Sequence, residues 1–159
     1  MANIYSRLSD PLFNITCVYH HMRDNSFTGL KKDLAFDIAF RQAKEFLNLS
    51  ENKTALFCCI FYLYFETGER PVNLSILSDA TGTTPLRFLE FRDYFDALEE
   101  LGYIVSDKGG DPVSFSKNYR VSEEVTEAIL KGNSELFQKG LRPKNPDLTY
   151  PEDIKMLGN

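Results

Sequence analysis

The stretch VNLSILSDATGTTPLRFLEFRDYFDALEELGYIV, from Val72 to Val105, decides the fold of this chain. Its apolar side chains recur every three or four residues on both sides of Gly82, which predicts two helices at about 74–80 and 84–101. Gly82 suits the left-handed backbone conformation that ends many helices. The stretch therefore predicts two helices that are joined by a tight turn.

Both ends of the second predicted helix carry recognisable signals. Thr84 suits the capping position, Pro85 suits the first helical position, and Gly102 suits the end. The residues that follow Gly102 are typical of a strand, and the segment from Asp107 to Pro112 is typical of a tight turn. A returning strand within 113–121 completes a predicted β-hairpin.

Helical periodicity also flanks this stretch. It predicts helices at about 11–23, 34–47, 51–66 and 123–131, with Ser50 and Ser122 as caps of the last two. The helix at 51–66 is apolar around most of its circumference, so we expect it in the middle of the domain. Residues 132–159 contain three prolines and three glycines, which predicts an extended tail.

The predicted order of elements resembles the winged helix-turn-helix. The segment LEELGYI at 98–104, followed by a hairpin with a glycine-rich tip, is common in that family. We therefore expect a mainly α fold with a small β-hairpin wing (α+β), which is a winged helix-turn-helix with extra N-terminal helices. The expected parts are an N-terminal extension at 1–33, a winged-helix domain at 34–131, and an extended tail or linker at 132–159.

Charge argues against a protein that depends on phosphate contacts. The 159 residues include 18 basic and 23 acidic side chains, and the net charge is −5. Between Glu51 and Leu130 there are seven basic and 14 acidic residues. Binding to DNA requires basic side chains that neutralise phosphates, so this balance favours a protein-binding module.

A second resemblance involves the segment LSENKTALFCCIFYLYF, from Leu49 to Phe65. With the extension, the wing and the prolyl tail, it resembles the N-terminal region of some bacterial AAA+ ATPases over about 34–131. The resemblance implies a non-enzymatic module for protein interaction or regulation, next to an adjoining ATPase domain. The phosphate loop of that domain, Gly-x-x-x-x-Gly-Lys-[Ser/Thr], is absent from the sequence. The resemblance thus implies a fragment that binds neither ATP nor another cofactor.

The expected working surface is the face at 83–92 together with the wing near 107–112. The alternative is a DNA-binding transcriptional regulator, in which the same surface approaches base edges and phosphates. Under either interpretation, the candidate contact residues are Thr83, Thr84, Arg87, Glu90, Arg92, Lys108 and Lys117. The acidic run from Glu90 to Glu100 fits a partner-binding face or a solvated helix surface.

Other groups point to no catalytic or metal site. Cys17, His20 and His21 lie close together, but the sequence offers no second pair to complete four metal ligands. The adjacent Cys58 and Cys59 belong to an apolar helix, which favours buried, reduced thiols. The longest uncharged apolar run has 11 residues, too few for a membrane span, so we expect a cytoplasmic protein. A homodimer that forms through Phe57, Phe61 and Phe65 is the alternative to core packing of these rings.

Overall fold

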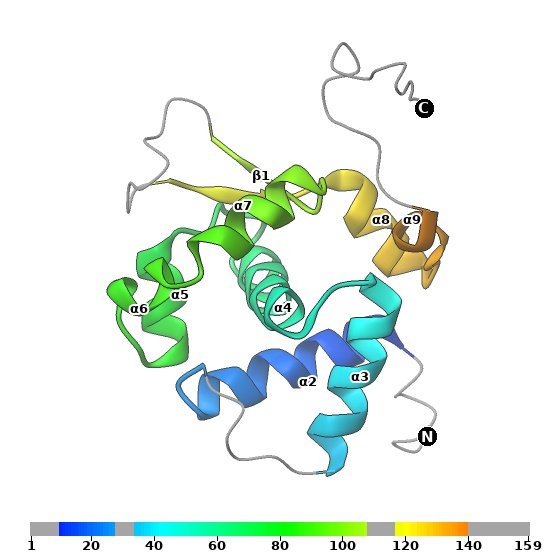
Figure 1. Cartoon of the computed structure of the whole chain (residues 1–159), viewed down its shortest axis with the longest axis horizontal. Helices are drawn as coiled ribbons and strands as arrows, with labels where there is room; N and C mark the ends of the chain where they lie inside the picture. The colour runs from blue at the N-terminus through cyan, green and yellow to red at the C-terminus, as the bar shows by residue number, and fades with distance from the viewer. Residues whose placement is uncertain (1–9, 28–33, 108–116, 140–159) are drawn as a thin grey trace.

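The computed structural model describes residues 10–27, 34–107 and 117–139. Within these ranges the fold is mainly helical, with eight helices and one two-stranded antiparallel hairpin, as the sequence predicts (Figure 1). The elements are α2 (Pro11–Asp24), α3 (Leu34–Leu47), α4 (Glu51–Glu66), α5 (Leu74–Thr81), α6 (Pro85–Leu89), α7 (Arg92–Glu100), β1 (Ile104–Ser106), β2 (Tyr119–Val121), α8 (Glu123–Lys131) and α9 (Glu135–Lys139).

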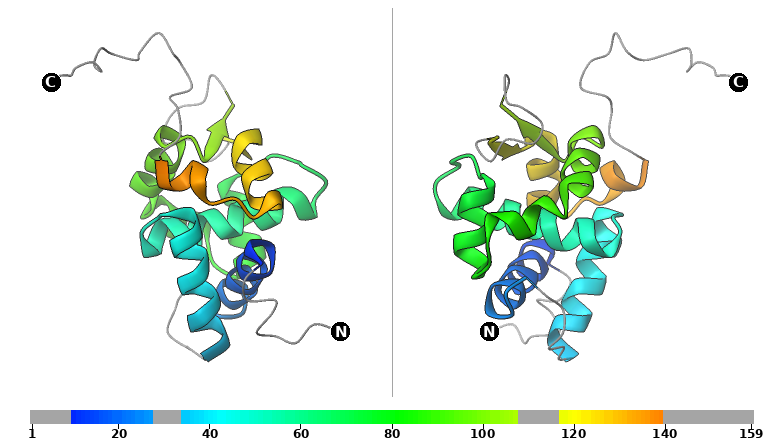
Figure 2. Two further views of the ribbon diagram at one scale, coloured as in Figure 1. Left: turned by 90° about the vertical axis from the view of Figure 1, so that its right-hand side faces the viewer. Right: turned by 60° about the vertical axis from the view of Figure 1, so that its left-hand side comes forward.

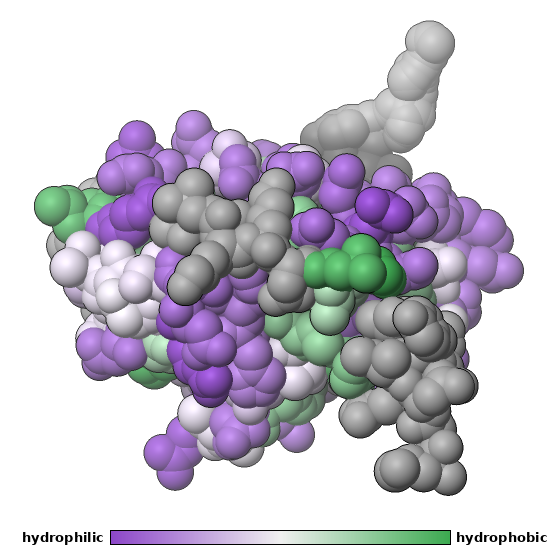
Figure 3. Space-filling model, turned by 90° about the horizontal axis from the view of Figure 1, so that it is seen from below, coloured by the Kyte–Doolittle hydropathy of each residue, from purple (hydrophilic) through white to green (hydrophobic). Residues whose placement is uncertain are grey.

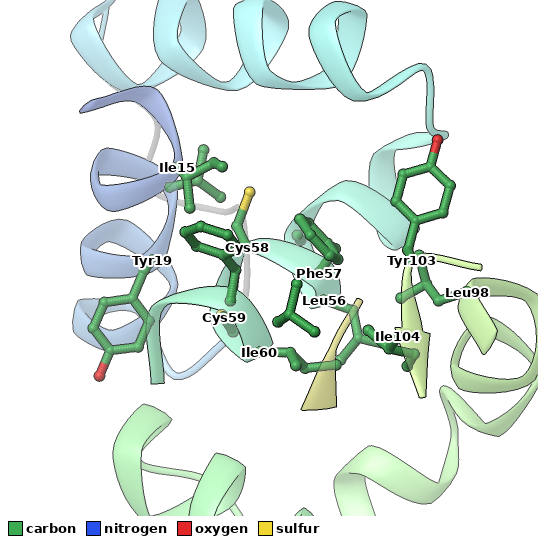
Figure 4. Packing of buried hydrophobic residues seen from close by; sticks show 14 of the residues in the cluster. Ile15, Tyr19, Leu56, Phe57, Cys58, Cys59, Ile60, Leu98, Tyr103 and Ile104 are labelled. Carbon is green, nitrogen blue, oxygen red and sulfur yellow. The ribbon is translucent and has the colours of Figure 1, made fainter. Parts of the chain in front are cut away.

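Helix α4 lies at the centre of the fold, as its apolar circumference predicts. Helices α2 and α3 cover one side of it, and α7 and the hairpin cover the other (Figures 1 and 4). Phe57, Cys58 and Ile60 of α4 are completely buried. Because burial of apolar surface is the main stabilising contribution to folding, α4 organises the elements around it.

The N-terminal helix α2 packs on α3 and α4 of the same chain. Its buried residues Ile15, Val18 and Met22 join the common core. Two further views show α2 beside α3 and below α4 (Figure 2). The described part of the predicted extension is therefore an integral layer of the fold.

The predicted helix at 84–101 is wrong in one respect: it is two helices, α6 and α7. At the break, the amides of Glu90 and Phe91 bond to carbonyl groups three residues back, those of Arg87 and Phe88, at 3.2 and 3.0 Å. Such bonds form the tighter 3₁₀ geometry in place of an α-helical turn. Upstream, Gly82 has the predicted left-handed conformation, with φ of 71°.

The hairpin pairs Ile104 with Val121 and Ser106 with Tyr119. Tyr119 and Val121 are buried whereas Arg120 is exposed, which confirms the alternation that the sequence predicts. The predicted tip of the wing, the Val113 end of its returning strand, and Lys108 lie outside the described residues.

The capping positions that the sequence predicts for two helices are confirmed, but no side-chain capping bond forms at either. Ser50 and Ser122 hold the capping positions of α4 and α8, but neither hydroxyl bonds to a helix amide. The Ser122 hydroxyl donates instead to the carbonyl of Gly102, which joins the start of α8 to the end of the α7 segment.

The expectation of an extended segment after residue 131 is wrong for Glu135–Lys139, which forms α9. Phe137 is only 2% exposed and packs against the rings of Phe46 and Tyr103. Asn48 donates to the carbonyl of Phe137 at 3.1 Å. These contacts attach α9 to the end of α3 and to the residue that precedes the hairpin.

Seen from below, the coloured part of the surface is mostly hydrophilic, with hydrophobic residues in smaller groups (Figure 3). None of the described helices has the length and apolar character that a membrane crossing requires.

Candidate interaction surface

The structure places most of the predicted contact residues in or directly beside α6 and at the start of α7. Thr84, Glu90 and Arg92 are exposed, and Thr83 and Arg87 are half-buried. Thr84 is the cap of α6, since its side-chain oxygen accepts a hydrogen bond from the Arg87 amide at 3.3 Å. The turn and the short α6 therefore expose part of this segment to solvent.

Arg87 interacts with two residues that directly follow α6, Glu90 and Phe91. Its Nη1 lies 2.9 Å from Oε1 of Glu90, and its guanidinium lies 4.9 Å from the centre of the Phe91 ring. An ion pair of this kind neutralises the cation and a ring contact orients it. Binding of a phosphate by Arg87 would require the exchange of Glu90 for the new anion.

Lys117 lies on the segment that leads into β2, and it also has an acidic partner. Its Nζ lies 3.4 Å from Oε1 of Glu99, and its side chain is only 13% exposed. The other carboxylate oxygen of Glu99 accepts a hydrogen bond from the Ser106 hydroxyl. The ammonium also lies 5.7 Å from the centre of the Tyr119 ring. Lys117 thus fixes the hairpin to α7 and is poorly placed for a phosphate.

The outward face of α7 is acidic. Asp93, Asp96 and Glu100 are exposed, while Phe95 and Leu98 on the opposite face are buried. Residues at spacings of three, four and seven lie on one side of an α-helix, so these carboxylates share a face. Together, residues 85–100 carry two basic and five acidic side chains.

Buried tyrosines lie beside this acidic helix. Burial raises the pKa of Tyr119, and the negative charges of Glu99 and Asp96 raise it further. Burial alone raises the pKa of Tyr103 to about 12. The carboxylates of Glu99 and Asp96 therefore disfavour additional negative charge beside Tyr119.

Exposed leucines add apolar area near both ends of the surface. Leu86 on α6 is 68% exposed, and Leu101, directly after α7, is 44% exposed. Apolar side chains beside charged ones are typical of protein interfaces, although single exposed leucines are common on all proteins.

The other predicted groups lie apart from this surface. His20 packs edge-on against Tyr19 and Tyr62, and His21 stacks on Phe36. Within residues 10–27, 34–107 and 117–139, no group of three or more His, Cys, Asp or Glu side chains could hold a metal ion.

Cys58 and Cys59 are fully buried, and burial raises the pKa of both thiols. The phenylalanine rings of α4 belong mainly to the core: Phe57 and Phe61 are buried and Phe65 is partly buried.

Two residues that shape the surface were not singled out from the sequence. Glu99 was assigned only to an acidic run, because its partner Lys117 is 18 positions away across the hairpin. Phe27 packs its ring against Phe88 and Phe91, more than 60 residues downstream. Both contacts join residues of different elements, so the spacing of residues along a single helix or strand does not predict them.

Comparison of the chain with known protein families, with curated proteins and with solved structures finds no match.

Proposed function

We propose that this chain is a non-enzymatic winged-helix module that binds a protein, and that its binding surface is the face at 83–92 with the adjacent acidic side of α7. The observation that carries the proposal is the internal pairing of two of the basic side chains that a DNA-binding winged helix would direct at base edges and phosphates. Arg87 is paired with Glu90 and Lys117 with Glu99.

The loss of phosphate contacts and the negative charge of the surface both favour a protein partner. Nonspecific affinity for DNA arises from the release of counterions by basic side chains, and each missing phosphate contact weakens it. A net negative charge on α6 and α7 makes the approach of a polyanion unfavourable at physiological salt. The same charge, with Leu86 exposed nearby, suits a partner that offers basic and apolar side chains.

The proposed wider context is the N-terminal part of a bacterial AAA+ ATPase, in which the partner is the adjoining ATPase domain or a protein that regulates it. The support for this context is the resemblance of residues 34–131 and the winged-helix order of elements. In this setting the module supplies no catalytic group. Its contribution is a surface that orients or regulates the enzyme.

The DNA-binding alternative is tested by fluorescence anisotropy with labelled random-sequence duplex DNA, at low and at physiological salt. We expect no binding that persists at physiological salt. Glu90→Gln releases Arg87 and serves as a sensitised control, with a modest increase in binding at low salt. Tight, steeply salt-dependent binding by the unaltered chain, weakened by Arg87→Ala, would overturn the proposal.

The protein partner is tested by reading the gene downstream of Asn159 and by NMR. A phosphate loop encoded in the same reading frame supports the ATPase context. When the separately expressed ATPase segment is added to the ¹⁵N-labelled module, amide shifts are expected to change at 83–92 and on the exposed side of α7. Changes confined to α2, α3 or α8 would contradict the assigned surface.

A further inference from the structure

The break between α6 and α7 needs a cause outside its own sequence. The residues around it, Leu89-Glu-Phe-Arg92, include neither glycine nor proline. Sharp interruptions of helices almost always arise from those residues, from bulges, or from a side chain inserted against the helix. The apolar seam of Phe88, Phe91 and Phe95 also continues through the break at helical spacing.

A side chain from the end of the α2 segment lies at this break. The Phe27 ring centre is 4.9 Å from that of Phe88 and 5.3 Å from that of Phe91. Phe27 is 5% exposed, so its ring is enclosed by these neighbours. Phe88 lies near the end of α6, and Phe91 lies within the break, where 3₁₀ bonds replace α-helical ones.

The backbone that delivers Phe27 is held in an unfavourable conformation. Ser26 and Phe27 have φ values of 51° and 57°, in the left-handed region that residues with a side chain rarely adopt. Such conformations persist where the surroundings over-determine them, and they mark positions with a specific role. The Phe27 amide donates to the Met22 carbonyl at 2.6 Å, which fixes this turn to α2.

The same segment also adjoins the helix-turn-helix turn. A Cβ placed on Gly82 would lie 3.7 Å from Oγ of Ser26, which is an ordinary packing distance. Figure 1 shows the C-terminal end of α2 next to α5 and α6, and α2 and α5 are in contact. The end of α2 therefore touches the helix-turn-helix both at its turn and at its helix break.

We propose that Phe27 is a wedge that separates α6 from α7 and thereby sets the orientation of the α6 surface. With the ring in place, α6 packs against α5, whereas α7 packs against α4. Without it, the continuous seam favours one helix from Pro85 to Glu100, which would turn Thr84 and Arg87 to a new direction. Phe27 is thus a positioning residue, and its role does not depend on what the surface binds.

Multidimensional NMR of the labelled chain tests the wedge by comparing Phe27→Ala with Phe36→Ala. Phe36 is similarly buried at 6% exposure, but its ring stacks on those of His21 and Phe40, away from the break. In Phe27→Ala we expect the ¹³Cα resonances of Glu90 and Phe91 to shift downfield to α-helical values. We also expect new contacts between residues four apart across the break. Phe36→Ala is expected to leave both unchanged.

A folded Phe27→Ala chain that keeps the original shifts at Glu90 and Phe91 would overturn the proposal. If Phe27→Ala does not fold, Phe27→Leu decides, because leucine retains apolar volume without the ring. The wedge predicts a partial downfield shift at the same two residues, and unchanged shifts there overturn it. A loss of stability without any change at the break indicates ordinary core packing, which also overturns the wedge. The outcome of the DNA-binding and partner-binding experiments does not affect this test, because the shifts at Glu90 and Phe91 are measured on the free chain.

Discussion

A hydroxyl at the start of a helix stabilises it only when its oxygen reaches an unpaired amide, and neighbouring residues decide whether it does. Thr84 accepts from the Arg87 amide and Asn73 accepts from the Ile76 amide at 2.8 Å. Ser122 holds the same kind of position, but its hydroxyl donates to Gly102 instead. The residue type predicts the capping position, whereas tertiary contacts decide the bond.

This difference predicts unequal effects of two similar substitutions. Thr84→Ala removes a capping bond and should lower the free energy of unfolding by about 1 kcal/mol. Ser50→Ala removes a hydroxyl that makes no capping bond and should change it by less than about 0.5 kcal/mol. Urea denaturation of both variants measures the two values. An equal loss in both would show that the cap of α6 contributes nothing particular.

At the scale of elements, hydrophobic periodicity and boundary residues were sufficient to predict three of the helices. The predicted bounds of α3, α4 and α8 match the structure, because each helix combines an apolar stripe with a recognisable boundary. The break after Leu89 could not be predicted, since the local seam is continuous and Phe27 is distant in sequence. Helix α9 has only five residues, which is too short for periodicity to show.

The candidate surface could be predicted only in part, for the same reason. The positions of Thr84, Glu90 and Arg92 follow from the turn and the helix phase, and all three are exposed. The ion pairing of the basic residues cannot be predicted from the turn and the helix phase. A lysine on a predicted wing strand was expected to face phosphates, but Lys117 is largely covered and paired with Glu99, a pairing that only the packing of the hairpin on α7 creates.

The contact between the hairpin and α7 gives the second prediction. Glu99→Gln removes the charge opposite Lys117 while it keeps an oxygen for the Ser106 hydroxyl. Because this pair is partly buried, we expect the free energy of unfolding to fall by about 1 kcal/mol. Glu127→Gln is the matched control, since its pair with Lys131 is exposed and should contribute little. Equal losses in the two variants would contradict a specific role of Glu99.

At the scale of the whole molecule, the tyrosines predict sensitivity to alkaline pH. Tyr103, whose side chain is labelled in Figure 4, ties the start of the hairpin to α3, because its hydroxyl donates to the Leu47 carbonyl. Burial raises its pKa from 10.0 to about 12. The neutral form is therefore favoured in the folded state, and the associated stability is complete below the unfolded pKa and lost as the pH rises through the folded pKa.

The expected loss spans about pH 10 to pH 12 and amounts to about 3 kcal/mol for Tyr103 alone. Tyr19, Tyr64 and Tyr119 have pKa values raised in the same direction, so they add to the loss. Urea denaturation at a series of pH values measures it, and Tyr103→Phe should make the dependence shallower. A free energy of unfolding that stays constant or increases above pH 10 would contradict the assignment.

The folded unit extends beyond α8. Phe137 fills a site between Phe46 and Tyr103, so the segment after α8 contributes to the same core as α3 and the hairpin. Phe137→Ala should lower the free energy of unfolding by about 3 kcal/mol, because removal of a buried ring leaves a cavity. Lys139→Ala, on the exposed side of α9, should change it by less than about 0.5 kcal/mol.

Truncation after Lys131 separates the two possible descriptions of this segment. If α9 belongs to the folded unit, the truncated chain loses at least as much stability as Phe137→Ala in thermal and urea denaturation, because it also loses the bond from Asn48. If it is only a linker, the truncated chain retains the full free energy of unfolding. Phe137 contacts Tyr103, which immediately precedes β1. A loss of stability on truncation would therefore also mean that a displacement of α9 affects the start of the hairpin.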